Sequence, residues 1–157
     1  AGLAFGIMPL RLIAGGIGLL IEQAFNGEVA SLAMRESLFS VGMDSWYGVL
    51  LMFLGIGVLA PIGEEFFFRG LLFDFFKKKV GVGWGVTLSS LAFGLAHFDS
   101  LAVVFSSMLM GVVMASAMER TKTIWISIFM HIFTNASAVL LMAGSLQLEK
   151  LLDTQIF

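Results

Sequence analysis

Six polar side chains recur in otherwise apolar sequence at spacings typical of one helix face. They are Glu64, Glu65, Arg69, His97, His131 and Asn135. Carboxylates and imidazoles activate water by taking its proton, and an imidazole beside an amide can stabilise an oxyanion. A charged side chain inside a membrane costs free energy unless it is paired or in contact with water, so ionisable groups there are functional candidates. The set indicates hydrolytic or proton-moving chemistry if these segments span a membrane.

Helix geometry divides the first group into a pair and a free acid. Glu65 and Arg69 are four residues apart with the acid first, which is the favourable order for an ion pair. Glu64 and Arg69 are five apart, or about 140° around the axis at about 100° per residue. We therefore expect Arg69 to hold Glu65 and to leave Glu64 as a general base. The alternative is that both acids only satisfy Arg69 and helix ends.

The two histidines are the only ones in the chain, and each lies in a different apolar segment. Phe93 and His97 share a helix face at the end of their segment, and so do His131 and Asn135 in the middle of theirs. Alone, His97 is more typical of a helix end or a core. His131 and Asn135 would alternatively form a hydrogen-bonded pair between helices, since polar groups in lipid need partners.

The composition indicates an integral membrane protein. Of 157 residues, 59% are hydrophobic and 13% are charged, against about 25% charge in a soluble domain. Mean hydropathy is +0.98. The chain lacks cysteine, which excludes disulfides and thiolate chemistry, and it has no basic stripe for nucleic acid. We predict one all-α domain over residues 1–157, a polytopic integral membrane helical bundle, and, because it begins at Ala1 rather than Met, further helices before it.

The apolar block 46–76 is too long for one straight span. Pro61 and Gly63 lie in its middle, and proline removes a helical hydrogen bond and disfavours helix before it. We therefore expect a kinked or broken helix at the motif, with a span over 46–60 and a second helix over 62–76.

The remaining segments are predicted from runs of apolar residues and from the charged, glycine or serine residues that end each run. We expect an amphipathic connector at the membrane interface over 22–45. The other expected elements are spans over 2–21, 81–98, 101–118 and 124–143, and a short amphipathic tail over 146–157. The basic residues at 77–79 and 120–122 fall on one side if spans alternate, and the positive-inside rule places that side in the cytoplasm.

Three motifs occur in order: Glu-Glu-x-x-x-Arg at 64–69, Phe-x-x-x-His at 93–97 and His-x-x-x-Asn at 131–135. Together they resemble the CAAX-protease and bacteriocin-processing family of intramembrane endopeptidases, the type II CAAX prenyl endopeptidase group. The resemblance covers a motif core from about residue 60 to residue 138. Each motif alone is weak, but their combination uses both histidines and is fairly specific.

The resemblance implies a role for each matching residue. Glu64 and His97 would activate the attacking water. Glu65 would be a second active-site carboxylate held by Arg69, and Phe93 would pack beside the site.

His131 and Asn135 would stabilise the oxyanion of the tetrahedral intermediate. The family implies either a glutamate-type protease without a metal or a zinc metalloprotease. Two histidines and a glutamate can ligate zinc, yet none of the motifs is the His-Glu-x-x-His zinc helix. Zinc is therefore an open alternative.

The implied function is hydrolysis of peptide bonds in membrane-tethered, lipid-modified or leader-peptide substrates, at the plasma membrane in a prokaryote. One alternative is a non-enzymatic immunity or accessory membrane protein, which would predict an eroded motif. Another is a proton or cation pathway, which would place acids or histidines along several spans. The motif is intact, and the early spans offer only Arg11, so both alternatives are less well supported.

Overall fold

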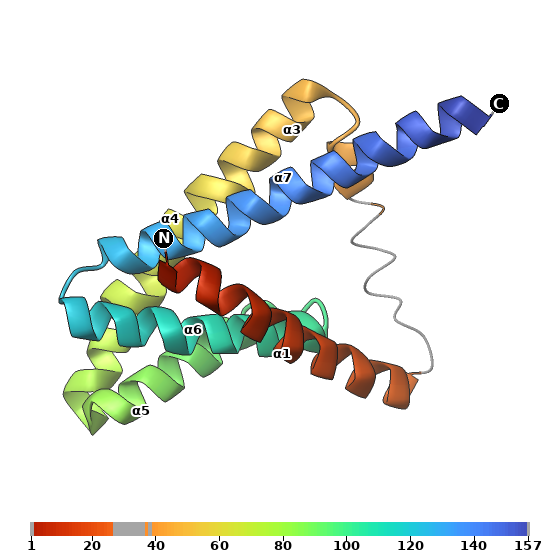
Figure 1. Cartoon of the computed structure of the whole chain (residues 1–157). Helices are drawn as coiled ribbons and strands as arrows, with labels where there is room; N and C mark the ends of the chain where they lie inside the picture. Colours follow the sequence, from red (N-terminus) through yellow and green to blue (C-terminus); the bar gives the residue numbers. More distant parts are fainter. Residues whose placement is uncertain (1, 27–36, 38, 157) are drawn as a thin grey trace.

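A computed structural model describes residues 2–26, 37 and 39–156, and these residues form only helices and turns (Figure 1). Within them, three helices are long and apolar enough to cross a membrane: Trp46–Leu95, Leu101–Thr121 and Trp125–Asp153. The predicted all-α membrane bundle is confirmed. Most of the amphipathic connector expected over 22–45 lies outside the described residues.

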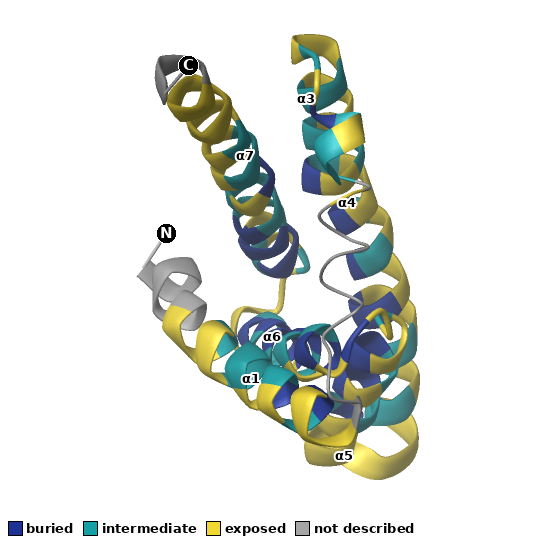
Figure 2. Cartoon of the chain, turned by 90° about the vertical axis from the view of Figure 1, so that its right-hand side faces the viewer, coloured by how far each residue is buried: buried dark blue, intermediate teal, exposed yellow. Residues whose placement is uncertain are grey.

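The helices form a packed layer from which two arms rise (Figures 1 and 2). Helix α6 (Leu101–Thr121) lies in the layer, with α1 (Gly2–Asn26) and α5 (Asp74–Leu95) packed against it. The arms are α3 (Trp46–Met52), with the segments that continue it, and α7 (Trp125–Ile156). The two arms run antiparallel, so residues far apart in sequence meet where the arms join the layer.

The first arm is one helix that changes type along its length. After α3 come the π-helix η1 (Phe53–Leu59), the α-helix α4 (Ala60–Glu65) and the π-helix η2 (Phe66–Phe73). Backbone angles stay right-handed helical at each junction. Of the two alternatives expected at the motif, a kinked or a broken helix, the structure shows no break: the helix continues and changes type on both sides of α4. Pro61 sits in the first turn of α4, where a missing N–H is tolerated.

The chain reverses at Gly81 instead. Gly81 has φ 87° and ψ 171°, a conformation that residues with a Cβ rarely adopt. The two sides of this turn lie against each other, because a Cβ on Gly85 would come within 3.0 Å of the Lys77 Cα. This turn sends the second part of α5 back along η2 toward His97.

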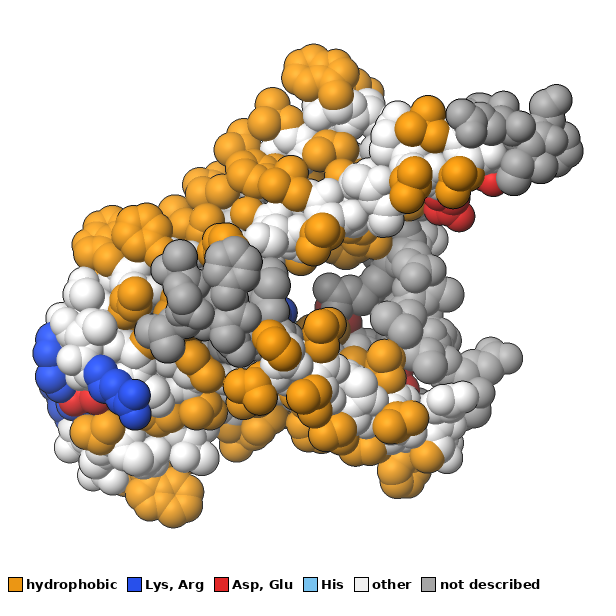
Figure 3. Space-filling view, viewed as in Figure 1, with side chains coloured by type: hydrophobic (Ala, Val, Ile, Leu, Met, Phe, Trp, Pro, Cys, Tyr) orange, Lys and Arg blue, Asp and Glu red, His pale blue; other side chains and the backbone are white. Residues whose placement is uncertain are grey.

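The two basic loops lie at the same end of the molecule, as predicted. Lys77 Nζ lies 2.5 Å from Glu119 Oε2, and Lys122 also pairs with Glu119. Figure 3 shows Lys or Arg side chains (blue) beside an acidic side chain (red) at this end. The assignment of this end to the cytoplasm stays a prediction.

The last helix is longer than expected. We expected it to end near Gly144, but α7 continues to Ile156, a length of about 48 Å at 1.5 Å per residue. One internal glycine costs only about 1 kcal/mol, and the leucine-rich sequence that follows favours helix. Lys150 Nζ also donates to Asp44 Oδ1 at 2.6 Å, which ties the end of α7 to the residues before α3.

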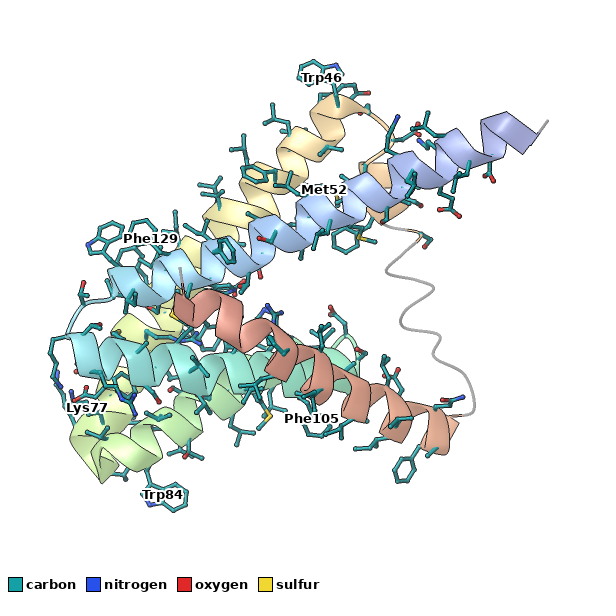
Figure 4. All side chains as sticks on the ribbon, in the orientation of Figure 1. Trp46, Met52, Lys77, Trp84, Phe105 and Phe129 are labelled. Atoms are coloured by element: carbon teal, nitrogen blue, oxygen red, sulfur yellow. The ribbon has the colours of Figure 1, made fainter. Side chains whose placement is uncertain are left out.

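The core lies where η2, α5, α6 and α7 meet. Its buried apolar members are Phe68, Phe93, Met110, Met114, Ala117 and Met130. Large apolar side chains also cover the outside, as expected where lipid is the solvent. Trp46, Trp84 and Phe129, labelled in Figure 4, are all largely exposed.

Glycine at position 18 allows α1 to approach α6. A Cβ on Gly18 would lie 2.4 Å from the Ala102 Cα, whereas one on Gly16 would meet nothing within 4 Å. We expect Gly18→Ala to lower the free energy of unfolding by about 1–3 kcal/mol through this clash. Gly16→Ala should leave it unchanged or raise it by up to about 1 kcal/mol. Thermal unfolding in detergent measures both, and equal midpoints for the two variants would contradict this packing.

Candidate active site

A buried ion pair anchors the site. Arg69 Nη1 lies 3.0 Å from Glu65 Oε1, and the two side chains are 1% and 0% exposed. The Arg69 guanidinium also lies 4.2 Å from the centroid of the Phe93 ring, a favourable cation–π distance. The pair predicted from the four-residue spacing is confirmed, and Glu64 is left to face elsewhere.

His131 bonds to the same carboxylate from α7. Its Nδ1 lies 2.8 Å from Glu65 Oε1. Because Glu65 is ion-paired with Arg69 and accepts only, His131 Nδ1 carries the hydrogen and donates it. The Nε2 atom of His131 then faces Glu64 Oε2, 3.7 Å away.

His97 reaches Glu64 from the turn that follows α5. Its Nδ1 lies 2.8 Å from the Phe93 carbonyl oxygen, so this nitrogen donates and fixes the tautomer. The Nε2 atom of His97 lies 3.5 Å from Glu64 Oε2. The side chain is 29% exposed, against 1% for His131.

Phe93 holds the two imidazoles apart. Its ring centroid lies 4.7 Å from that of His97 and 5.5 Å from that of His131. The residue is fully buried, so its ring cannot move without disturbing the core. The predicted packing of Phe93 beside the site is confirmed, and its backbone carbonyl adds a contact that the motif did not reveal.

The three groups therefore meet around one oxygen atom. Glu64 Oε2 is buried and has no hydrogen-bond partner among the described residues. The neighbouring Nε2 atoms of His97 and His131 are both acceptors when their imidazoles are neutral. Three acceptors facing one another need a shared proton or a donor such as a water molecule. This arrangement suits the activation of water.

Asn135 makes a contact that the sequence reasoning missed. Its Nδ2 donates to the Ile56 carbonyl at 3.3 Å. In η1 the hydrogen bonds run back five residues, as Ala60 N–H to Gly55 O shows. The next donor in that series would be residue 61, a proline, so Asn135 supplies the hydrogen bond that Pro61 cannot. An oxyanion role for Asn135 stays a prediction.

A close helix crossing lets Asn135 reach that carbonyl. A Cβ on Gly57 would lie 3.2 Å from the Ala136 Cα, so the backbones of η1 and α7 nearly touch. Two signals for this contact exist in the sequence. They are small residues at both positions, and a proline in an apolar helix, which leaves an upstream carbonyl free.

A zinc ion would need lone pairs of several side chains aimed at one point about 2.0–2.2 Å from each. In the part of the chain that the structure describes, no group of three His, Asp or Glu side chains is arranged to hold a metal ion. The residues as placed do not fit zinc, and we derive no chemical step through it.

Pro61 and Asn135 should be energetically coupled. We expect Asn135→Ala to lower the free energy of unfolding by about 1–3 kcal/mol, because the Ile56 carbonyl loses its donor. In a Pro61→Ala background, residue 61 has its own N–H, so the same change should cost at least about 0.5 kcal/mol less. Thermal unfolding of the wild type, both single variants and the double variant measures this coupling. Strictly additive effects would contradict it.

Comparison with known proteins gives a consistent result. The family model of the Rce1-like type II CAAX prenyl endopeptidases matches residues 46–137, which include all three motifs. A protein of Bacillus subtilis (strain 168), named "Putative membrane peptidase YdiL", is 30% identical over 142 residues, covering 88% of this chain and 58% of that protein. An "Uncharacterized 24.3 kDa protein" of Escherichia coli is 30% identical over 87 residues, covering 53% of this chain and 40% of that protein.

The chain thus spans 58% and 40% of the lengths of these two relatives. No solved structure matches it. The family match covers more than half of the chain and includes every residue of the site. The chain belongs to the Rce1-like type II CAAX prenyl endopeptidase family.

Proposed function

We propose that this protein is an intramembrane endopeptidase that uses a water molecule activated by Glu64 and His97. The observation that carries the proposal is the position of Glu64 Oε2, which is buried, lies 3.5 Å from His97 Nε2 and has no hydrogen-bond partner within the described part of the chain. A water molecule within reach of both atoms can give its proton to either. Its oxygen then adds to the carbonyl carbon of the scissile peptide bond.

The negative oxygen of the resulting intermediate needs hydrogen-bond donors or positive charge. His131 and Asn135 lie one turn apart on α7, on the side that faces α4 and η1. We assign the oxyanion to these two side chains, as the family resemblance implies. For this role the Asn135 amide must turn from the Ile56 carbonyl to the substrate.

The partly exposed His97 supports a route for water. Hydrolysis inside a bilayer requires water at a site whose surroundings are apolar. His97 lies beyond the last residue of α5, Leu95, while Glu65, Arg69 and His131 are nearly inaccessible. Water reaching Glu64 from the His97 side would meet the base first and the buried pair last.

The family supports substrates that are tethered to the membrane, either lipid-modified proteins with a CAAX-like end or leader peptides. In a prokaryote the protein would act at the plasma membrane. The donor geometry favours a glutamate-type mechanism without a metal.

The purified protein in detergent tests this proposal with a panel of lipid-modified and leader-type membrane peptides. We expect the wild type to cleave at least one peptide, and Glu64→Gln and His97→Gln to lose at least about 100-fold in kcat/KM. Glu149→Gln changes an exposed acid near the end of α7 and should cleave like the wild type. Cleavage that is unchanged in both Glu64→Gln and His97→Gln would contradict this mechanism.

A chelator arm tests the metal alternative. Activity should persist after dialysis against a zinc chelator, with residual zinc measured by elemental analysis. Loss of activity that returns on adding zinc would instead establish a zinc metalloprotease. Absence of cleavage across the panel would favour an accessory role or a proton pathway.

A further inference from the structure

We infer that His131 is the general acid, which gives its Nε2 proton to the nitrogen of the departing amine. This inference rests on the proposed peptidase function and adds a second role for a residue assigned to the oxyanion. It follows from the charges and hydrogen-bond directions of the buried cluster.

The charge balance of the cluster calls for one extra proton. Glu64 and Glu65 bring two negative charges, and Arg69 brings one positive charge. With both imidazoles neutral, the group would carry a net negative charge in a largely apolar environment. Uncompensated charge is expensive there. A single proton on one of the neighbouring imidazoles makes the cluster neutral.

His131 is the better place for that proton. Its Nδ1 lies 2.8 Å from a Glu65 oxygen and its Nε2 lies 3.7 Å from a Glu64 oxygen. An imidazolium is a double donor, and hydrogen bonds between ionised partners are the stronger ones. His97 has one nitrogen committed to a neutral partner, because its Nδ1 donates to the Phe93 backbone carbonyl, although the charge of Asp99 also acts on it. His131 has a carboxylate oxygen near both nitrogens, at hydrogen-bond distance from Nδ1 and at ion-pair distance from Nε2.

Glu65 is held in the position that this role requires. Its Oε1 atom lies 3.0 Å from Arg69 Nη1 and 2.8 Å from His131 Nδ1. The carboxylate can thus orient the ring and stabilise its positive charge, as the buried aspartate does for histidine in serine-protease triads. Glu65 acts here by orienting the ring and need not take the proton itself.

The two imidazoles then both lie beside Glu64 Oε2, with different tasks. Water enters on the partly exposed His97 side and gives its proton to Glu64, and its oxygen bonds to the carbonyl carbon. The His131 imidazolium stabilises the oxyanion and gives its Nε2 proton to the nitrogen as the carbon–nitrogen bond breaks. The products are a carboxylic acid and an amine. The proton on Glu64 then passes to His131 Nε2, which restores the starting state.

An amide and an ester of the same peptide separate this role from oxyanion binding. An amine nitrogen must be protonated to leave, whereas the alkoxide of an ester leaves with much less help. We compare a cleavable membrane peptide with its analogue carrying an ester at the scissile bond. For His131→Gln, kcat/KM for the amide should fall at least about tenfold more than for the ester, as expected for loss of general-acid catalysis. For His97→Gln, kcat/KM for the amide and kcat/KM for the ester should fall by similar factors.

Glu65→Gln provides a second variant with a milder change. Its side-chain oxygen can still accept from His131 Nδ1, but the charge that stabilises the imidazolium is gone. This variant should change the ratio of kcat/KM for the amide to kcat/KM for the ester in the same direction as His131→Gln, by a smaller factor. Ser145→Ala, a change on a distant part of α7, should leave both rates unchanged. The thermal unfolding midpoint in detergent checks that each variant is folded. If His131→Gln does not fold, the result for Glu65→Gln decides the test.

Equal losses on amide and ester in the folded His131→Gln and Glu65→Gln variants would overturn the inference. His131 would then act on the oxyanion alone, and the proposed peptidase function would stand. A wild-type protein that cleaves neither substrate would instead overturn the peptidase function itself. The two failures are therefore distinguishable in one set of measurements.

Discussion

The buried Glu65–Arg69 pair is the constraint on which the rest of the site depends. Two charges with 0% and 1% exposure are tolerated only with close partners, and removing one member of such a pair typically costs about 3–5 kcal/mol. The pair lies between η2, α5 and α7, so those elements must supply its surroundings. Phe93 covers the guanidinium and His131 donates to the carboxylate. The side chains of the candidate site are thus arranged around a buried charge pair.

The helix that carries the pair is irregular on both sides of it, and this irregularity has a use. The π-helical segments η1 and η2 flank α4, which carries both glutamates. A π-helical turn changes which residues share a face and frees backbone groups, and such turns are frequent at functional sites. Here the Ile56 carbonyl is taken up by Asn135 from α7. The same contact that satisfies the backbone fixes the register of α7 against α4, and with it the position of His131.

Sequence reasoning succeeded where the determining interactions are local. The Glu65–Arg69 pair follows from a four-residue spacing, and the start of α6 follows from Ser100, whose hydroxyl accepts from Val103 N–H. It failed where a distant segment supplies the missing partner. A break at Pro61 was one expectation because its hydrogen bond is lost, but the helix continues, and the donor that satisfies the free carbonyl is 79 residues away from it. Likewise, the sequence did not show that the outer half of α7 contacts Asp44, 106 residues before Lys150.

The site shows the same division between local and distant interactions. The motifs name the residues, but they do not say which nitrogen of each histidine faces which acid. That depends on a contact between residues 66 positions apart for His131 and on a backbone carbonyl for His97. These two contacts make the histidines unequal, because one is anchored by a charged group and the other by a neutral one. A hydrolase needs a group that takes a proton and a group that gives one. In the mechanism proposed above, this difference in surroundings separates His97, which helps Glu64 to activate water, from His131, which gives the proton.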